Sequence, residues 1–247
     1  MSEAKTHKET AYCDKHESNF EQTITKAEVF EGKVISFRSG CPKCIEENAL
    51  ESKRKDDAEL AGRIASDRER MGIPDRLAGT TFDRYRTTTA EQNHAKKRFI
   101  DLASGSFNII ATGNVGTGKT MLSCCLLEEI RGKRSGKIIR LIELIRILKE
   151  TWRRDSHQNE RDVIRSFVDL DILIIDEVGI QFGSETEALF LFDIINGRYD
   201  KMRPTVMLSN LGIDALKKVL GERIIDRMRD DGGILLQFNW DSERGRK

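Results

Sequence analysis

The sequence predicts an α/β fold, with a parallel β-sheet covered by helices and a small zinc-ribbon-like domain before it. Three observations lead to this prediction. From residue 73 onward, apolar runs typical of buried strands alternate with stretches of helical periodicity. One apolar run leads into the glycine-rich segment GNVGTGKT at 113–120, which a helical stretch follows. Two pairs of metal-ligand residues, C-x-x-H and C-x-x-C, lie before residue 45.

The composition indicates a soluble protein with one substantial core, since 38% of the 247 residues are hydrophobic and 34% charged. Because 42 basic residues face 41 acidic ones, bulk charge gives no argument for a nucleic-acid partner. No secretory signal and no membrane-spanning run are present. Five cysteines without a signal point to the reducing cytoplasm, where paired cysteines are more often metal ligands than disulfides.

Composition divides the chain into a zinc-binding module at 1–48, a helical linker at 49–72 and an α/β domain at 73–247. The segment 45–72 is dense in Ala, Glu, Lys and Arg and poor in large apolar side chains, which predicts an exposed helix or coiled linker. Its charges fit a solvated face, with DNA binding as the alternative.

Within the α/β domain, strands and helices alternate. Strands are expected at 107–112, at the start of 137–154, at 168–179 and at 204–210, and helices at 121–132, in the rest of 137–154 and at 185–200. This alternation implies a parallel sheet with helices on both faces.

The segment GNVGTGKT is typical of a P-loop, which binds the phosphates of a nucleotide. Its glycines let backbone N–H groups face a polyphosphate, and the following helix adds its positive N-terminal end. Lys119 is expected to reach the β- and γ-phosphates, and the Thr120 hydroxyl to hold Mg²⁺. An ordinary glycine-rich turn is the alternative, but the strand and helix on either side favour the P-loop.

Two carboxylates and an amide follow the later apolar strands. Asp176 and Glu177 end one strand, where a P-loop ATPase would use the first carboxylate for Mg²⁺ and the second to polarise the attacking water. Asn210 ends the next strand and fits a sensor of the γ-phosphate, or a plain strand cap. The consecutive acidic pair favours ATP hydrolysis to ADP over phosphate transfer to a small molecule.

Two arginines, Arg223 and Arg227, lie four residues apart on one face of a predicted helix. A guanidinium supplied by a neighbouring subunit often stabilises the charge that develops on a transferred phosphoryl group. Arginines are also common on plain surfaces.

With these residues assembled, the chain resembles the AAA+ ATPases of the DnaC-type replicative-helicase loaders. The resemblance covers residues 72–247 and is carried by GIPDRLAGTTFDRY, GNVGTGKT, ILIIDEVGIQ, PTVMLSN and above all LGERIIDRMRDDGGILLQFNWDSERGR. It implies a AAA+ domain without a substantial C-terminal lid. It also implies self-association, binding of a hexameric replicative helicase through the N-terminal region, and placement of that helicase on single-stranded DNA.

The resemblance assigns the site residues one by one. The catalytic residues would be Lys119, Asp176, Glu177, Asn210, Arg227 as the arginine finger and Arg223 as a second interface arginine. The residues that bind ATP or ADP would be Gly113, Asn114, Val115, Gly116, Thr117, Gly118, Lys119, Thr120 and Met121, with Phe82 and Tyr85 bordering the adenine. Mg²⁺ would be held by Thr120 and Asp176. The single-stranded DNA contacts would be Lys149, Trp152 and Ser184.

An aromatic face that stacks bases beside cations that meet phosphates suits Trp152 and its basic neighbours. Core packing is the alternative for Trp152. Cys124 and Cys125, on the helix after the P-loop, are expected to pack in the core.

The four residues Cys13, His16, Cys41 and Cys44 have the spacing of two zinc knuckles that share one ion. Strand alternation between the pairs fits a zinc-ribbon-like hairpin. A closed Cys₃His site has no open coordination position, so Zn²⁺ would be structural; reduced, unliganded cysteines are the alternative. This module departs from the helical N-terminal domain expected of the loaders, and leaves open whether it binds helicase, DNA or another replication protein.

Two other functions remain open. A transposition-helper AAA+ ATPase would prefer duplex DNA, whereas the short C-terminal tail and the single-strand contact region favour a loader. A nucleotide-gated zinc-binding adaptor would not need hydrolysis, and the intact Lys119, Asp176 and Glu177 argue against it.

Overall fold

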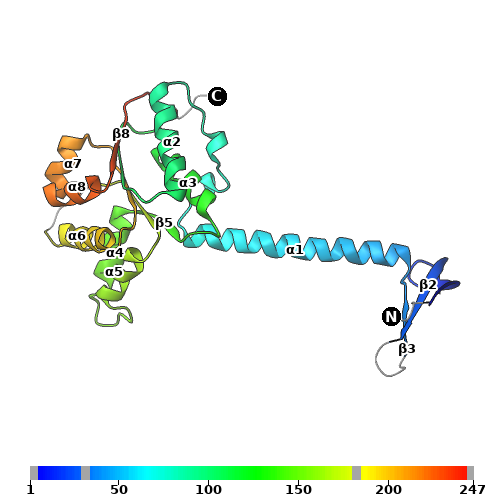
Figure 1. The fold of residues 1–247 in the computed structure, drawn as a ribbon. Coiled ribbons are helices and arrows are strands. Elements are labelled where there is room, and N and C mark those ends of the chain that lie inside the picture. The colour runs from blue at the N-terminus through cyan, green and yellow to red at the C-terminus, as the bar shows by residue number, and fades with distance from the viewer. Residues whose placement is uncertain (1–4, 29–33, 180–184, 244–247) are drawn as a thin grey trace. The chain divides into compact units, whose positions relative to one another are not determined.

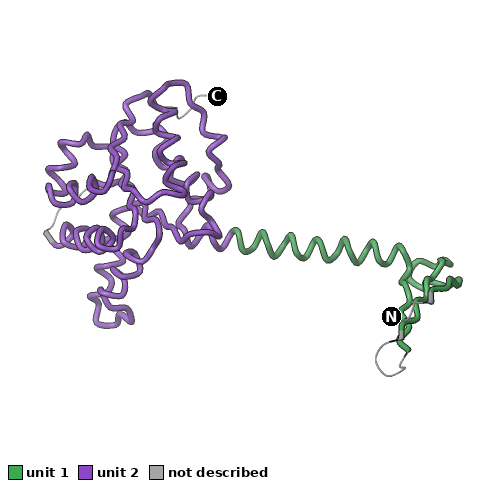
Figure 2. The backbone as a smooth tube through the Cα atoms, in the orientation of Figure 1, with its two compact units in different colours: residues 1–64 green, residues 65–247 purple. Residues whose placement is uncertain are grey.

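The computed structural model describes residues 5–28, 34–179 and 185–243 of the chain. The chain forms two compact units, residues 1–64 and 65–247, which Figure 2 colours separately. The boundary falls within the helix α1 (Pro42–Arg70). Among the described residues, no helix combines the length and apolar character needed to cross a lipid bilayer.

The N-terminal unit contains a three-stranded antiparallel sheet in the order β1-β2-β3. The strands are β1 (Lys5–Cys13), β2 (Ser18–Glu28) and β3 (Val34–Arg38). The hairpin of β2 and β3 agrees with the strand alternation expected between the two knuckles, but β1 was not expected. Since Cys13 pairs with Ser18 at the end of the β1–β2 hairpin, the first knuckle lies in the turn between these strands.

The helix α1 buries none of its residues. Helix-favouring Ala, Glu, Lys and Arg dominate it, and ion pairs at i, i+4 join Lys55 to Glu51 and Arg63 to Glu59. Its charges form a solvated face, as the composition predicts.

The larger unit is built on a five-stranded parallel sheet in the order β5-β6-β7-β4-β8 (Figure 1). The strands are β4 (Ile109–Gly113), β5 (Gly136–Arg140), β6 (Ile172–Asp176), β7 (Thr205–Leu208) and β8 (Ile234–Phe238). The helices are α2 (Ala90–Ser104), α3 (Lys119–Ile130), α4 (Leu141–Glu150), α5 (Glu160–Val168), α6 (Glu185–Asp200), α7 (Ile213–Leu220) and α8 (Glu222–Arg229), with short 3₁₀ turns η2 (Asp75–Leu77) and η3 (Phe82–Arg84).

Alternating side chains of the strands enter two hydrophobic clusters, one on each face of the sheet. Along β4, Ile109 and Ala111 pack with α2 and α3, whereas Ile110 packs with α4 to α8. The strands are therefore buried on both sides, as their continuous apolar runs predict. Cys124 and Cys125 belong to the first cluster, which confirms their expected place in the core.

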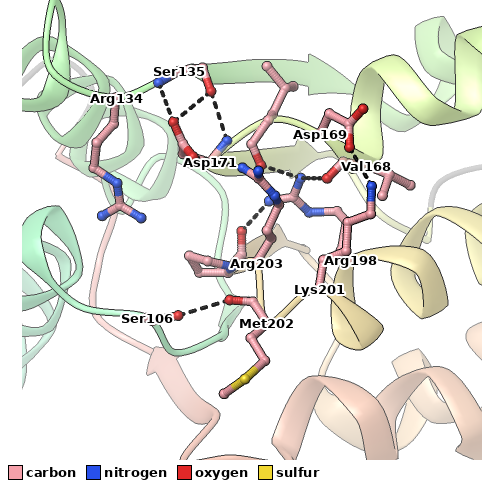
Figure 3. A network of polar contacts seen from close by, with 12 residues as sticks. Ser106, Arg134, Ser135, Val168, Asp169, Asp171, Arg198, Lys201, Met202 and Arg203 are labelled. Atoms are coloured by element: carbon pink, nitrogen blue, oxygen red, sulfur yellow. Dashed lines mark hydrogen bonds and ion pairs between the residues drawn. The ribbon is translucent and has the colours of Figure 1, made fainter.

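A buried arginine joins the amino ends of β6 and β7 (Figure 3). Arg198 of α6 is fully buried and donates to the carbonyls of Phe167, Val168, Leu170 and Pro204 and to Thr205 Oγ1. Burial lowers the pKa of Arg198 to about 9. Because β6 and β7 are parallel, their carboxyl ends, with Asp176 and the residues after Leu208, lie at the opposite edge of the sheet from Arg198.

The sequence analysis does not predict the strand β8 or the helices α2, α5 and α7. β8 lies beside β4 and completes one edge of the sheet. The helix α2 begins with a capping box of Thr89 and Gln92, a signal that is readable from sequence.

Candidate functional site

The glycine loop lies between the end of β4 and the start of α3. Gly113, Gly116 and Gly118 have φ values of 124°, 80° and 94°, which a residue with a side chain rarely adopts. A Cβ at Gly113 would lie 2.4 Å from the carbonyl oxygen of Phe238, and one at Gly118 would lie 2.6 Å from the ring of Tyr85. The glycines are therefore required by the close approach of neighbouring groups as well as by the curl of the loop.

The ammonium group of Lys119 lies inside the curled loop. Its Nζ donates to the carbonyl oxygens of Gly113 and Asn114, at 2.8 Å and 2.7 Å. The Lys119 side chain comes from the first turn of α3, whose N-terminal backbone N–H groups also face the loop. This places a cation and a positive helix end at one point, the arrangement that binds phosphate.

The end of β6 brings two carboxylates to the same place. Asp176 Oδ2 accepts a hydrogen bond from the Thr120 hydroxyl at 2.9 Å, and its Oδ1 accepts from the backbone N–H of Glu177 at 2.7 Å. Glu177 has a φ of 57° and an exposed side chain. This left-handed backbone is unusual for a residue with a side chain, and such strain is typical of functional sites.

These groups surround a cavity of about 730 Å³. Its lining includes Val115, Gly116, Thr117, Gly118, Lys119, Thr120, Met121, Asp176, Glu177 and Asn210, together with Gly72, Pro74, Arg76, Leu77, Ile138, Ile139, Arg140, Glu143 and Glu243. Thus residues 115–121 of the predicted P-loop, both carboxylates and the amide Asn210 meet in one cavity. Gly113 and Asn114 do not line it, and their carbonyls accept hydrogen bonds from Lys119. Its volume and its combination of backbone donors, a buried cation and hard oxygen ligands fit a nucleotide with Mg²⁺.

The two aromatic residues expected at the adenine do not line this cavity. Phe82 and Tyr85 are buried in the first hydrophobic cluster, and the Tyr85 hydroxyl donates to the carbonyl of Thr117 at 3.2 Å. Burial raises the pKa of Tyr85 to about 12. The Tyr85 ring packs against the loop outside the cavity, while Pro74 and Leu77 of the same segment line the cavity.

Several residues of the cavity were missed by the sequence reasoning. Arg140 ends β5 directly opposite Asp176 and forms an ion pair with Glu143, which lowers the pKa of Glu143. Arg140 is a polar residue at the end of an expected strand, as Asp176 and Asn210 are, and this pattern is a signal in the sequence that could have found it. Outside the cavity lining, the buried Ser209 hydroxyl donates to the carbonyl of Val178 at 2.6 Å and joins the loops that follow β6 and β7.

The two arginines of α8 do not line the cavity of their own chain. Arg223 is exposed. Arg227 is half-buried against α6, where its Nε donates to Asn196 Oδ1 at 2.7 Å. A role for either arginine at a nucleotide would therefore concern a neighbouring copy.

The expected DNA contacts lie around the end of α4. Trp152 is 56% exposed, packs its ring against Phe190 and donates from Nε1 to Glu160 at 2.6 Å. Lys149 forms an ion pair with Glu187 at 2.7 Å. Ser184 lies outside the described residues. Trp152 is thus a surface aromatic and not a core residue.

The four zinc-knuckle residues come together in the N-terminal unit. Their ligand atoms all lie within 4.8 Å of one another. Cys13 Sγ lies 3.6 Å from Cys44 Sγ, and His16 Nδ1 lies 3.4 Å, 3.7 Å and 3.4 Å from the sulfurs of Cys13, Cys41 and Cys44. A tetrahedral zinc ion with bonds of about 2.3 Å to sulfur and about 2.0 Å to nitrogen separates its ligand atoms by roughly 3.5–3.8 Å. The cluster therefore fits zinc.

The histidine of this cluster is oriented by a carboxylate. His16 Nδ1 faces the sulfurs, and Nε2 lies 3.1 Å from Glu47 Oε1. Lys15 holds the other oxygen of Glu47 at 2.6 Å. A carboxylate on the second ring nitrogen is the usual support of a zinc-binding histidine. Glu47 lies on α1 next to the second knuckle and was not predicted.

Comparison with known families gives a match over most of the chain. The family model of the IstB-like ATP binding proteins matches residues 71–246. This range contains the whole nucleotide cavity and excludes the Cys₃His cluster.

Among curated proteins, the chain is similar to the replicative helicase loader DnaC of Escherichia coli strain K12. The two are 31% identical over 207 residues, which cover 81% of this chain and 84% of DnaC. The helicase loader DnaC of Buchnera aphidicola subsp. Baizongia pistaciae is 32% identical over 200 residues, with 77% and 78% covered. The uncharacterized protein YdaV of Escherichia coli strain K12 is 30% identical over 187 residues, with 74% and 75% covered.

Solved structures give the same fold. A crystal structure of the DnaC helicase loader aligns with a TM-score of 0.59 at 20% identity, over 66% of this chain and 99% of that one. The crystal structure of DnaI aligns with a TM-score of 0.58 at 17% identity, over 70% and 94%. At these identities the likeness concerns the fold alone, and it confirms the AAA+ arrangement of sheet and helices expected from the sequence.

Proposed function

Because this chain belongs to the family of IstB-like ATP binding proteins, with a AAA+ fold, we propose that it is an ATPase that loads a hexameric replicative helicase onto single-stranded DNA. The observation that most supports a loader is the 31% identity to a replicative helicase loader over 84% of that protein's length. Similarity to the uncharacterized protein YdaV does not favour one function over another within the family.

The nucleotide cavity supports ATP hydrolysis as the driving reaction. In this proposal the backbone of residues 113–118 and the ammonium of Lys119 bind the phosphates, and Thr120 and Asp176 hold Mg²⁺. The metal, when bound, neutralises charge on the phosphate oxygens. Glu177 polarises the attacking water, since its side chain lines the cavity one residue beyond the Mg²⁺ ligand. Asn210 senses the γ-phosphate from the end of β7.

We assign Arg227, with Arg223 beside it, to the nucleotide of a neighbouring copy. Neither arginine lines the cavity of its own chain, which favours action across an interface between copies. Hydrolysis would then require self-association of the ATPase domain. Coupling of this kind makes ATP turnover a property of the assembly and not of one chain.

The surface at the end of α4 is the proposed contact for single-stranded DNA. The exposed ring of Trp152 offers a face for base stacking, and Lys149, Arg153 and Arg154 supply positive charge nearby. A preference for single strands separates a loader from a transposition helper, which would bind duplex DNA more tightly.

The Cys₃His cluster supports a structural zinc ion that holds the N-terminal module together. We assign residues 1–48 to this module, 49–72 to a helical linker and 73–247 to the ATPase domain. The module is the proposed docking element for the helicase. Four protein ligands leave no open coordination position, so the ion has no catalytic part in this proposal.

A loading assay tests the proposal with the full-length chain. The replicative helicase from the same genome is incubated with single-stranded circular DNA, with and without this protein and ATP, and helicase bound to DNA is measured. We expect loading only when both are present, and Glu177→Gln should lower the rate of ATP hydrolysis by about 100-fold or more while ATP still binds. No helicase binding together with a preference for duplex DNA would overturn the loader and favour the helper.

A pull-down tests the docking element. The helicase should be captured by the parent chain and lost with Cys41→Ser, which removes one zinc ligand. If the Cys41→Ser chain captures the helicase equally well, the zinc-binding module does not dock it. The pull-down with Glu177→Gln separates docking from hydrolysis, since this variant should still capture the helicase. In the loading assay, an adaptor that does not need ATP hydrolysis would load helicase equally well with Glu177→Gln.

A further inference from the structure

The side chain of Arg227 is held by three residues of α6. Its Nε donates to Asn196 Oδ1 at 2.7 Å. The centre of its guanidinium lies 5.0 Å from the ring centroid of Phe192 and 5.7 Å from that of Tyr199, within the range of cation–π attraction. One amide and two aromatic rings therefore define the position of this group.

These three residues form a stripe on one face of α6. Phe192, Asn196 and Tyr199 follow the i, i+4, i+7 spacing that brings side chains together on a helix. Arg198, which directly precedes Tyr199 in the sequence, is fully buried and anchors α6 in the core. A rigid helix thus presents a preformed cradle for the arginine.

Two further hydrogen bonds orient the members of the cradle. Asn196 Nδ2 donates to Asp200 Oδ2 at 3.2 Å, so that the amide oxygen is directed to Arg227. The Tyr199 hydroxyl donates to Asp230 Oδ2 at 2.6 Å, which links the end of α6 to the residue that caps α8. The cradle is therefore built from both helices.

The cradle holds the guanidinium without neutralising it. Within residues 5–28, 34–179 and 185–243, Arg227 forms no ion pair, and the side-chain contact given by Asn196 engages only the Nε–H group. The rings cover the face of the guanidinium, and its edge N–H groups are the donors that bind a phosphate in bidentate fashion. A purely structural tether would be strengthened by a carboxylate in place of Asn196.

We propose that Phe192, Asn196 and Tyr199 are positioning residues that hold the guanidinium of Arg227 ready for the nucleotide of a neighbouring copy. This inference rests on the proposed function, in which Arg227 acts in trans. Arg223, one turn earlier on α8, is exposed and has no comparable set of contacts among the described residues. Family resemblance alone favours Arg227 over Arg223 as the arginine finger. The contacts of the cradle with Arg227 give a physical reason for this choice.

A subunit-mixing experiment tests the inference with full-length chains. Asn196→Ala should bind ATP as the parent does but hydrolyse it about tenfold more slowly, a fraction of the 10³-fold or more that an arginine finger can contribute. Lys119→Ala removes the phosphate-binding lysine but retains the cradle and Arg227. When the inactive Lys119→Ala variant is mixed with the slow Asn196→Ala variant, Lys119→Ala subunits should supply a well-held Arg227 to the intact cavities of Asn196→Ala subunits. The activity of the mixture should then exceed the sum of the separate activities.

Two matched variants complete the design. Asn196→Asp keeps the hydrogen bond and adds an ion pair, so that a tether would be retained or strengthened while phosphate binding by Arg227 would be impaired. We expect low activity with a thermal stability no lower than that of the parent. Asp193→Asn changes a carboxylate that lines the same hollow as Asn196 but has no contact with Arg227 among the described residues, and it should hydrolyse ATP at the parent rate.

The outcomes separate this inference from the proposed function. If Arg227→Ala is rescued by Lys119→Ala but Asn196→Ala is not, the cradle does not act through Arg227 and the inference is overturned. Full activity of Asn196→Asp would have the same meaning. If Arg227→Ala is not rescued either, the trans role of Arg227 in the proposed function is overturned, and the cradle with it.

Discussion

The Thr120 hydroxyl donates a hydrogen bond to Asp176 Oδ2, with 2.9 Å between the two oxygens. This contact joins the first turn of α3 to the end of β6 and places two hard oxygen ligands side by side. Thr120→Val removes the hydroxyl at nearly constant volume. We expect the affinity for ATP with Mg²⁺ to fall by about tenfold, on the order of 1.4 kcal/mol, while the affinity for ATP in EDTA stays the same. Titration with a fluorescent ATP analogue under both conditions measures this, and equal losses with and without Mg²⁺ would contradict the assignment.

The hydrogen bond between His16 and Glu47 predicts the strength of the zinc site. Glu47→Ala leaves the four ligands in place but frees the Nε2 side of His16, so zinc should bind with the same 1:1 stoichiometry and about 10- to 100-fold lower affinity. Competition with a chromophoric chelator measures the affinity. Glu46→Ala, the neighbouring exposed carboxylate, is the matched control, and an equal effect of both variants would rule out a specific role for Glu47.

The parts of the fold that were predictable from sequence depend on short-range signals. The strand Ile172–Asp176 is a continuous apolar run followed by carboxylates, so its burial and its polar end are both local facts. The proposed zinc ligands Cys41 and Cys44 are likewise separated by two residues, and this spacing alone brings them together. Such features need no knowledge of the tertiary structure.

The parts that were not predictable depend on distant partners. Tyr85 could be placed before the first strand of the sheet, but only the approach of Gly118 decides that its ring supports the loop instead of lining the cavity. Arg198 is an arginine that α6 buries completely, because backbone carbonyls from two separate segments converge on it. Phe192, Asn196 and Tyr199 contact Arg227 only because α8 packs against α6, and this packing cannot be read from the sequence.

The close contact between Tyr85 and Gly118 predicts that a methyl group added at residue 118 destabilises the protein. Gly118 has a φ of 94°, and a Cβ there would lie 2.6 Å from the Tyr85 ring. Gly118→Ala should therefore lower the free energy of unfolding by about 1–3 kcal/mol and weaken ATP binding, because the loop must shift. Gly132 has a φ of 76° with open space around its Cβ position, so Gly132→Ala reports backbone strain without the clash. Equal ATP affinity of the two variants would contradict the steric argument.

The exposed ring of Trp152 predicts the behaviour of the DNA surface. Trp152→Ala should weaken binding of single-stranded DNA by about tenfold, within the range of about 1–3 kcal/mol that base stacking contributes, and Trp152→Phe should retain most of the affinity. Fluorescence anisotropy with a labelled oligonucleotide measures both. Leu189→Ala removes another exposed apolar side chain that cannot stack. Lys149 is a less direct test, because its loss would also remove the ion pair between Lys149 and Glu187.

The carboxylate of Glu128 predicts how stability depends on pH. Burial alone would raise its pKa, but hydrogen bonds from Arg68 at 2.6 Å, the backbone N–H of Gly79 at 2.6 Å and Arg131 at 3.1 Å together hold the pKa of Glu128 below its ordinary value. Since the folded state binds this proton less tightly than the unfolded state, the group stabilises the fold above the ordinary glutamate pKa, and this contribution is lost as the pH falls through the lowered value.

Glu128→Gln should remove this contribution. At neutral pH the variant should unfold at a free energy lower by about 1–3 kcal/mol, because it leaves Arg68 and Arg131 without their counter-charge. On acidification toward pH ~3 the difference from the parent chain should shrink, since protonation removes the same charge from the parent. Urea denaturation at a series of pH values measures both effects. Glu129→Gln, which alters an exposed ion pair with Lys133, should change stability little at any pH, and a pH-independent gap for Glu128→Gln would show that its charge is not what stabilises this contact.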